Sequence, residues 1–316
     1  MRISSAVATG LAVAAVVVPA AAADGLPVLN VDVGSSGIAA PGGAVRYVTV
    51  TAGDQTIVEA TRRRGGQVVR QQSWPGAWTI PAVAYDRTAG GLSADRRTLV
   101  LIEPRTSFPR KETRLLVVDA FRLGSAALVD LHGDFSFDAL SPDGSRIFLI
   151  QYTSPIDPTR YVVRAYDVST HRLLPKPIVD PRDATEKMRG NPLSRATSPD
   201  GRFAYTLYDG GGHPFVHALD TARSTARCID LDRIPPRLNL WQLRLRLSGD
   251  GRVLAVERGA TRFAALDTRT WAPVALSSAG RSWWPVAAAG GILAALAAVA
   301  VLLLRRRPHP RPAPVD

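Results

Sequence analysis

The chain has 316 residues, of which 46% are hydrophobic and 21% charged, a composition typical of a globular domain and not of a disordered chain. Its 39 Lys and Arg residues exceed its 27 Asp and Glu residues. Nearly all the basic residues are arginines spread along the sequence, without the basic run and interleaved aromatic residues of a nucleic-acid binder, so a nucleic-acid partner is not expected.

The first residues have the three parts of a secretory signal peptide. Arg2 supplies the positive start, an apolar stretch runs to Val18, and small residues follow. Cleavage after Ala22 or Ala23 fits the small-residue rule for such signals. Residues 1–23 are therefore predicted to be a signal peptide that directs the next domain out of the cytoplasm, and an uncleaved anchor helix is the alternative.

An internal repeat organises residues 24–282, the predicted extracytoplasmic domain. A serine, an aspartate two residues later and a following apolar strand occur together four times, at Ser93, Ser141, Ser198 and Ser248, with spacings of 48, 57 and 50 residues. An apolar strand that ends in aspartate follows these serines by 26, 26, 22 and 19 residues, at Asp119, Asp167, Asp220 and Asp267. Two landmarks that recur four times in the same order indicate a repeat architecture.

The residues at the two landmarks predict tight turns between antiparallel strands. Asp-Gly after Ser-Pro supplies a turn with positive φ, and the β-branched and aromatic residues that follow favour a strand. At the second landmark, the aspartate and Thr170, Thr268 and Thr270 are predicted to cap another hairpin turn as side-chain acceptors. Each unit is therefore predicted to contain four short antiparallel strands.

A fainter copy of the unit precedes the first serine. Residues 45–50 and 57–61 have the pattern of strands, and a Gly-Gly pair leads to a third apolar segment. This copy brings the count to about five units, and a sixth, degenerate unit in residues 24–45 is left open. Because one sheet cannot cover both of its faces alone, such units are expected to pack around an axis.

The Ser-Pro-Asp-Gly-Arg turn and the later Tyr-Asp or Leu-Asp-Thr turn resemble the repeats of WD-repeat-like β-propellers of the TolB and surface-layer type. The resemblance covers residues 45–275 and implies an all-β propeller of about five four-stranded blades, or six. The first copy departs from the pattern because it lacks the serine and aspartate, and Arg96 stands where the other turns have glycine. The resemblance leaves the ligand undefined, because such propellers serve as scaffolds, sensors, binding modules and enzymes.

The order of the strands places the connections on two faces. Both kinds of turn are odd-numbered connections and are predicted to share one face, whereas the longer even-numbered connections share the other. The longer connections are residues 103–113, 153–160, 208–214 and, between units, 180–192. Loops gathered on one face of a rigid scaffold are typical binding elements.

The loop from Tyr208 to Pro214 contains three consecutive glycines between Asp209 and His213. The glycines would let a ligand approach the backbone, so Asp209 and His213 are candidate binding residues, and a wide turn between two strands is the alternative. His213 and His217 are four residues apart, which on a strand is about 13 Å and too far for one ion. No metal site and no cofactor are predicted.

Residues just before the serines are predicted to line an axial channel. They are Arg87, Asp138, Arg195, Arg244 and Arg246. Arginine alternates with leucine in the last repeat, which places Arg244 and Arg246 on one face of the strand, and Asp138 has the phase of Leu245. The arginines motivate the hypothesis of a pocket for an anionic ligand.

The sequence lacks short catalytic motifs. It contains no G-x-S-x-G, no H-E-x-x-H and no phosphate-binding Walker loop, so no catalytic residue is assigned. Cys228 is the single cysteine and is predicted to be a buried small hydrophobe, with a reactive thiol as the alternative. The absence of short catalytic motifs weakens the enzyme hypothesis without excluding it, because propeller enzymes assemble their sites from distant loops.

The end of the sequence predicts a single membrane span. Two tryptophans and a proline precede the nineteen apolar residues 286–304, and three arginines follow at once. Such a run is long enough to cross the bilayer as a helix, and the arginines indicate the cytoplasmic side. Residues 283–304 are therefore predicted to be a transmembrane helix and 305–316 a short cytoplasmic tail; a buried core helix is the alternative.

These features predict a single-pass protein of the cell membrane whose main domain is extracytoplasmic. The expected function is a binding, sensing or scaffold module for a protein or envelope component, and this expectation is placed ahead of an enzymatic activity. The alternative is a propeller hydrolase or lactonase with its active site in the central pocket. A part in a larger envelope or export assembly is a third hypothesis. Convergence of several acidic or histidine side chains on the axis would favour the hydrolase.

Overall fold

The structure is a computed structural model and describes residues 36–124, 126–183 and 188–276. The predicted signal peptide, transmembrane helix and cytoplasmic tail lie outside these residues. Within them the chain forms seventeen β-strands and a short 3-10 helix, η2 (Leu240–Gln242), so the prediction of an all-β domain is confirmed. No helix in the described segments is long and apolar enough to cross a membrane.

The strands form five antiparallel sheets, each built from strands that follow one another in the sequence. The first sheet contains β1 (Val45–Ala52), β2 (Gln55–Arg62) and β3 (Val68–Pro75), and the second contains β4 (Thr98–Ile102), β5 (Glu112–Asp119) and β6 (Ala126–His132). The third contains β7 (Phe135–Leu140), β8 (Arg146–Tyr152), β9 (Tyr161–Asp167) and β10 (Arg172–Leu173). The fourth contains β11 (Pro192–Thr197), β12 (Phe203–Tyr208), β13 (Phe215–Asp220) and β14 (Thr225–Asp230), and the fifth β15 (Arg244–Leu247), β16 (Val253–Arg258) and β17 (Thr261–Asp267).

The three sheets with only three named strands each gain a fourth, very short segment. Ile38 pairs with Tyr47 of the first sheet, Leu92 with Leu99 of the second, and Pro273 with Leu266 of the fifth. Each sheet is therefore a meander of four segments, as the sequence predicts. Ile38 belongs to the first sheet, so the described part of residues 24–45 does not form a separate sixth sheet.

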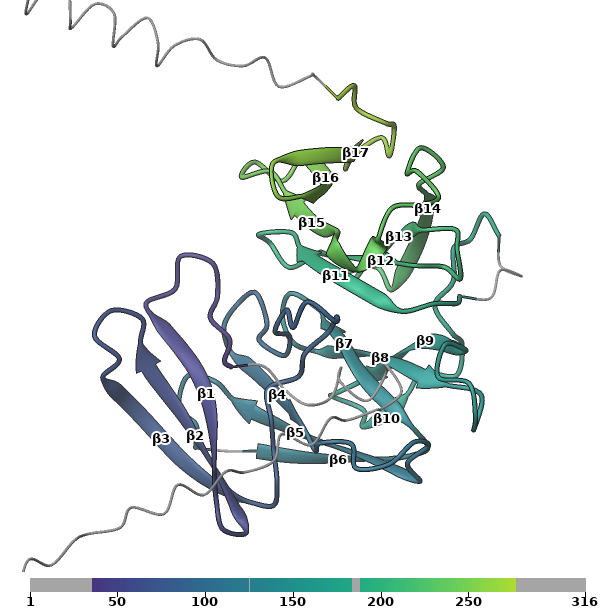
Figure 1. Cartoon of the computed structure of the whole chain (residues 1–316). Helices are drawn as coiled ribbons and strands as arrows, with labels where there is room; N and C mark the ends of the chain where they lie inside the picture. The colour runs from purple at the N-terminus through teal and green to yellow at the C-terminus, as the bar shows by residue number, and fades with distance from the viewer. Residues whose placement is uncertain (1–35, 125, 184–187, 277–316) are drawn as a thin grey trace, which may run out of the picture.

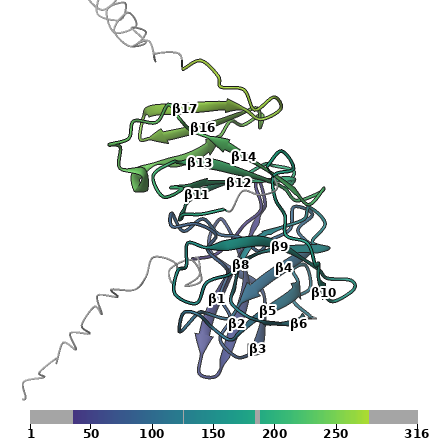
Figure 2. The ribbon, with the colours of Figure 1, turned by 90° about the vertical axis from the view of Figure 1, so that its right-hand side faces the viewer.

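The five sheets follow one another in an arc, and each packs against the next (Figure 1). The first and fifth sheets lie at opposite ends of the arc in both views (Figure 1, Figure 2). Each of the four buried clusters of the described residues joins consecutive sheets, and none joins the fifth sheet to the first. These clusters therefore do not close the five sheets into a ring.

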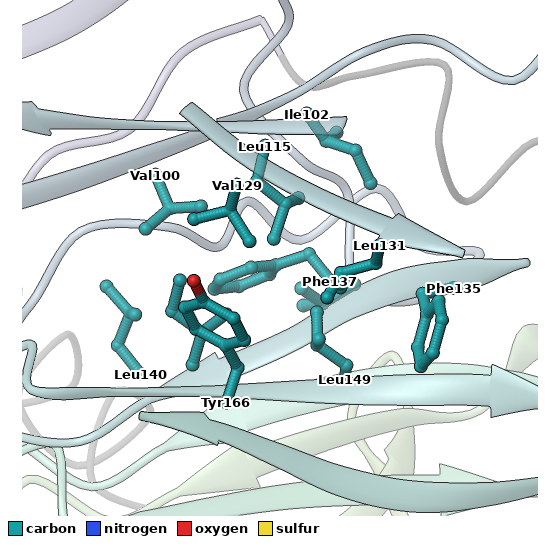
Figure 3. Close-up of a cluster of buried hydrophobic side chains, with 12 residues drawn as sticks. Val100, Ile102, Leu115, Val129, Leu131, Phe135, Phe137, Leu140, Leu149 and Tyr166 are labelled. Atoms are coloured by element: carbon teal, nitrogen blue, oxygen red, sulfur yellow. The ribbon is translucent and has the colours of Figure 1, made fainter. Parts of the chain in front are cut away.

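Apolar side chains from facing sheets fill the spaces between them. Between the second and third sheets, Val100, Leu115 and Val129 meet Phe137 and Leu149, all almost completely buried (Figure 3). Each such side chain contributes about 1.5–3 kcal/mol by leaving water. Stacking covers both faces of the second, third and fourth sheets, and one face of each sheet at the ends of the arc.

The serine and aspartate of the first landmark form the same hydrogen-bonded turn in four sheets. Each serine hydroxyl donates to its aspartate over 2.5–2.6 Å, in the pairs Ser93–Asp95, Ser141–Asp143, Ser198–Asp200 and Ser248–Asp250. Each serine oxygen also accepts the N–H of the fifth residue after it, over 2.8–2.9 Å. These bonds satisfy the backbone groups of the turn, and the hydroxyl lowers the pKa of the Asp143 carboxyl.

The aspartate of the second landmark caps the next turn, as predicted. Its carboxylate accepts the N–H of the third residue after it, over 2.8–3.0 Å, at Arg122, Thr170, Arg223 and Thr270. The threonine hydroxyls act differently from the expectation. Those of Thr170 and Thr270 donate to the aspartate, although the Thr270 hydroxyl also accepts the Ala272 N–H over 3.3 Å, and that of Thr268 donates to the Gly251 carbonyl over 2.7 Å.

Both turn types lie on one face of each sheet, which confirms the topological prediction. The N–H after the second aspartate donates to a carbonyl of the first turn over 2.8–2.9 Å, in the pairs Ala120–Arg97, Val168–Ser145, Thr221–Arg202 and Thr268–Arg252. We call this side the turn face and the side of the longer connections the loop face. A short strand ladder is thus closed at the turn face by a fixed set of side-chain and backbone bonds.

The third residue after each serine has a left-handed backbone. Its φ is +72° at Gly144, +71° at Gly201 and +73° at Gly251, whereas the second sheet has Arg96 there with φ +65°. A residue with a Cβ pays about 1–2 kcal/mol in this region, and glycine does not. Arg96, where the sequence departs from the repeat, is therefore a position of backbone strain.

Replacing Arg96 with glycine is expected to raise the free energy of unfolding by about 0.5–1 kcal/mol, because relief of the left-handed strain exceeds the greater flexibility of unfolded glycine. Denaturant unfolding measures the change. The Gly251→Arg variant is the reciprocal control, since it introduces the same strain where a new Cβ meets only Pro199 Cδ at 3.8 Å. Equal stabilities of all three proteins would contradict the explanation.

Candidate functional site

A cavity of about 310 Å³ lies where the inner segments of the sheets meet. Residues 38–41, the segment 88–96, the second half of β7 and the end of β11 line it. Ser93 and Ser198 of the Ser–Asp turns belong to this lining, so the cavity lies toward the turn face. We call it the axial cavity. The sequence predicts that the residues just before the serines line a channel at this place.

The position three residues before the serine lines the axial cavity in the second, third and fourth sheets. It is occupied by Gly90, Asp138, Arg195 and Leu245 in successive sheets. Asp138 and Arg195 line the cavity and are only 4% and 6% exposed. At Gly90 a Cβ would lie 2.8 Å from the Phe137 ring, so a larger side chain there would displace the third sheet.

Asp138 and Arg195 form a buried ion pair across the axis. One Nη of Arg195 donates to the Asp138 carboxylate, and the other donates to the Asp138 carbonyl over 3.1 Å. Arg195 Nε has no hydrogen-bond partner among the described residues. Two opposite charges that bond each other in this way stabilise each other after losing water.

A β-bulge turns Asp138 toward the axis. The pairing of β7 with β8 skips Asp138, since Phe137 pairs with Leu149 and Ala139 with Phe148. The extra residue is released from the ladder, and the strand bends so that the carboxylate meets Arg195 of the next sheet. Bulges commonly redirect one side chain in this manner.

A smaller opening of about 20 Å³ lies on the other side of the pair. Tyr152, Tyr161 and Tyr208 line it together with Asp138, toward the loop face. Burial raises the pKa values of the Tyr161 and Tyr208 hydroxyls, and Tyr161 donates to the Gly190 carbonyl over 3.1 Å. These hydroxyls stay protonated at neutral pH. The ion pair and the tyrosines thus separate the axial cavity from the loop face.

A second buried ion pair lies near the tyrosines, and no pattern in the sequence predicts it. Arg105 donates to Asp134 over 2.5 Å and to Ser136 over 3.1 Å, and its guanidinium lies 4.8 Å from the centre of the Tyr152 ring. Asp134 also accepts the N–H of Arg110. The pair fixes the long connection between β4 and β5 onto β7. Its role in the described structure is to order this loop.

A short hairpin between the first and second sheets crosses to the fourth. Ala82 pairs with Ala89, and Tyr85 N–H donates to the Pro192 carbonyl over 2.9 Å. Asp86 accepts the N–H of Arg195 over 3.3 Å. The hairpin therefore holds β11 and supports the backbone of the buried arginine from outside the repeat pattern.

Three of the predicted channel residues lie away from the cavity. Arg87 is exposed in the hairpin turn with φ +61°, not on an inner strand. Arg244 and Arg246 share a face opposite the buried Leu245, as predicted, but this face is exposed: Arg244 donates to the Trp241 carbonyl over 2.8 Å, and Arg246 pairs with Glu257 over 3.3 Å. Of the five candidates, only Asp138 and Arg195 meet at the axis.

Asp209 joins two loops of the loop face. Its carboxylate accepts the Asn191 N–H over 2.8 Å and the Asn191 side-chain amide over 2.7 Å. The Gly210 backbone has φ +58°, and a Cβ there would clash with the His213 carbonyl, so the glycine closes the turn. His213 is exposed at the tip. The contacts of Asp209 fit the wide-turn alternative.

His217 is a buried titratable group that the sequence analysis treated only as half of a rejected metal pair. It is 1% exposed in β13, opposite Cys228 of β14, and its Nε2 has no hydrogen-bond partner among the described residues. Burial lowers the pKa of His217 to about 4. Within the described segments no group of three or more His, Cys, Asp and Glu residues could hold a metal ion.

The repeated turns, the four-segment meanders and the shared axis define a repeat protein built from β-propeller blades. Its structural neighbours are TolB-like and WD40-type β-propellers. No protein-family model matches the sequence, and no curated protein matches it.

Three solved structures illustrate the likeness. TolB from Acinetobacter baumannii is 16% identical, with a TM-score of 0.41, and the match covers 72% of this chain and 51% of that one. The Cps50 (Swd1) propeller domain of Myceliophteria thermophila is 12% identical, with a TM-score of 0.44 and coverage of 79% and 69%. The dihydro-heme d1 dehydrogenase NirN is 14% identical, with a TM-score of 0.45 and coverage of 76% and 45%. The chain thus spans about half the length of that TolB.

Proposed function

We propose that this chain is a membrane-anchored, extracytoplasmic β-propeller of five blades that binds a protein or envelope component in the axial cavity. The observation that carries the proposal is the cavity itself, which has a volume in the range of ligand sites and is held by segments of four sheets. The predicted signal peptide and transmembrane helix support the location.

The walls of the axial cavity favour a partner group that is mainly apolar with a few polar atoms. Ile38, Val83, Leu92 and Phe137 offer apolar surface, and serine and threonine hydroxyls lie among the other lining residues. Asp138 is the acidic residue of the lining, and Arg195 already binds its carboxylate. This arrangement supports recognition more directly than general acid or base catalysis, for which a carboxylate must be available to the substrate.

The end of the described chain suggests how the domain is oriented. Residues after Asp267 turn back along β17, where Val274 N–H donates to Ala265 O, so the chain leaves toward the loop face. The predicted span begins soon afterwards, at Val286. The proposal therefore has the loop face toward the bilayer and the axial cavity toward the surroundings.

Photocrosslinking in intact cells tests the binding role. A photoreactive phenylalanine analogue at Thr197, an exposed residue of the cavity lining, is expected to capture a partner, because it reaches the entrance of the site. The same analogue at Thr261, exposed where β17 begins, is the control on the loop face. The adduct is expected in membranes washed at alkaline pH, since a spanning helix resists this wash.

A cavity-blocking variant makes the result specific. Ala94→Trp adds a large ring to an exposed lining residue and is expected to reduce the Thr197 adduct, whereas Ala222→Trp, on the same face outside the lining, is not. Equal capture from Thr197 and Thr261, or capture that Ala94→Trp leaves intact, would contradict the cavity as the binding site. Loss of all adducts into the wash would contradict the anchor.

A further inference from the structure

The fold gathers arginines that the sequence spreads out. Arg62 ends β2, Arg63 and Arg64 lie in the connection between β2 and β3, and Arg96, Arg97 and Arg122 lie in the two turns of the second sheet. Because both kinds of turn are on the turn face, these residues collect at one end of the first two sheets. The Arg63 N–H donates to the Ala44 carbonyl over 2.9 Å, which ties the first connection to this end. Arginines that are separate in the sequence therefore concentrate positive charge at this end of the two sheets.

A groove of about 840 Å³ runs between the first and second sheets at this end. Arg70, Arg96, Arg97 and Arg122 line it, and Gly43 and Ala44, which bond Arg63, belong to the same lining. We call it the arginine groove. Its volume is that of a site for a ligand of moderate size.

The arginine groove has more positive than negative charge. Its lining contains four arginines and two aspartates, Asp95 and Asp119. Both aspartates already bind the turns, since Asp95 accepts from Ser93 and Arg97 N–H, and Asp119 accepts from the backbone of residues 121 and 122. Their carboxylates are therefore engaged locally and compensate the arginines incompletely.

Three of the four guanidinium groups have no ion pair with the described residues. Arg122 lies 3.6 Å from Asp119, whereas Arg70, Arg96 and Arg97 have no acidic partner in the described chain. Arg70 instead lies over the Phe121 ring, 5.4 Å from its centre, and Arg96 donates to the Pro41 carbonyl over 3.2 Å. Phe121 is 66% exposed, which is unusual for a large apolar side chain and leaves its ring at the groove.

We propose that the arginine groove binds a ligand that carries two or more phosphate groups. A guanidinium group presents paired N–H donors that match the oxygens of a phosphate, and several such groups along one groove favour a ligand with several anionic groups. The exposed Phe121 ring supplies an apolar surface beside them. The proposal does not depend on the axial cavity or on the membrane anchor.

Inorganic tripolyphosphate is the probe for the test, with titration calorimetry on the full chain in detergent at low salt. Arg97→Gln is expected to weaken binding about tenfold, because one charge-assisted contact is lost. The turn is preserved, since Arg97 contributes its backbone N–H to Asp95 and not its side chain. Arg122→Gln is expected to act in the same direction.

Matched variants separate the groove from general attraction to a basic protein. Arg252 occupies the position of Arg97 in the Ser–Asp turn of the fifth sheet, and Arg223 that of Arg122 in the fourth. Arg252→Gln and Arg223→Gln are expected to leave the dissociation constant unchanged. Equal weakening by Arg97→Gln and Arg252→Gln, or no measurable binding by the parent, would overturn the proposal.

Two further ligands define the class and the source. Citrate is expected to bind more weakly than tripolyphosphate, and equal binding would overturn the assignment to phosphate. A soluble poly(glycerol phosphate) that competes with tripolyphosphate would indicate that the groove accepts phosphates repeated along a polymer. Failure of the polymer to compete, with tripolyphosphate still bound, would restrict the ligand to small oligophosphates.

Discussion

The Asp138→Ala variant is expected to lose about 3–5 kcal/mol of the free energy of unfolding, because it leaves the Arg195 charge buried without its partner. Arg195 is 6% exposed, and both of its Nη atoms donate to Asp138. No other described acid lies within ion-pair distance of this guanidinium. Urea denaturation at neutral pH, followed by tryptophan fluorescence, measures the loss.

A double variant distinguishes the unpaired charge from the loss of packing. Leucine occupies the equivalent repeat position in the fifth sheet, at the buried Leu245, so Asp138→Leu combined with Arg195→Leu replaces the pair by a side chain that the repeat already uses. The double variant is expected to recover most of the stability, since apolar replacement of a buried ion pair is often neutral. A loss below about 1 kcal/mol for Asp138→Ala would instead mean that water reaches Arg195 through the axial cavity.

The turns could be predicted from the sequence because their information is local. Serine, aspartate and glycine lie within four consecutive residues, and the serine and aspartate side chains bond each other and the backbone of the next two residues. The second turn is equally local, since Asp167 bonds Thr170 and Ser169. These bonds lower the pKa of Asp167 to about 2, chiefly through the Ser169 hydroxyl. Because the side chains of such a motif satisfy the backbone groups of its own turn, the motif predicts the same turn geometry wherever it occurs.

The axial site could be predicted only in part because alternation fixes which residues share a face and not where the face points. Arg244 and Arg246 are four and two residues before their serine, whereas the axis is faced by the residue three before, as at Asp138 and Arg195. The phase difference was visible in the sequence. Only the structure shows which of the two phases borders the axial cavity.

Long-range contacts leave no pattern in one sequence. Arg105 and Asp134 are 29 residues apart, and Arg195 meets Asp86 from 109 residues away. The hairpin that carries Asp86 lies outside the repeat, so Arg87 was assigned to an inner strand by counting back from Ser93. The arginine groove was missed for the same reason, because its residues come from three separate turns and connections and from the strands β1 and β3.

Folding stability is expected to fall by about 3 kcal/mol as the pH is lowered from about 6.5 to about 4, because His217 must stay neutral in the folded chain. Burial lowers its pKa from the ordinary 6.5 to about 4, while Asp138, Arg195 and Asp180 act on it more weakly. Over this range the unfolded chain takes up a proton at His217 and the folded chain does not. The contribution of neutral His217 to folding stability is complete above pH 6.5 and is lost progressively as the pH falls to about 4.

The carboxylates act in a different pH range, which makes the histidine effect separable. The pKa values of Asp143, Asp167 and Asp250 are lowered below 3.8 by the hydroxyl and backbone donors of their turns. Their stabilising contributions are therefore present at pH 4 and are lost as the pH falls further. A decline that begins near pH 6.5 belongs to a histidine and not to these turns.

His217→Phe is expected to remove the decline between pH 6.5 and pH 4. Phenylalanine keeps a ring beside Tyr208, whose ring centre is 6.3 Å from that of His217, and it removes both ring nitrogens, of which Nε2 is buried without a partner in the described chain. His213→Phe is the control, because His213 is exposed and its replacement is expected to leave the decline in place. Chemical denaturation at a series of pH values compares the three proteins, and a slope that His217→Phe does not change would show that His217 is reached by water in the folded state.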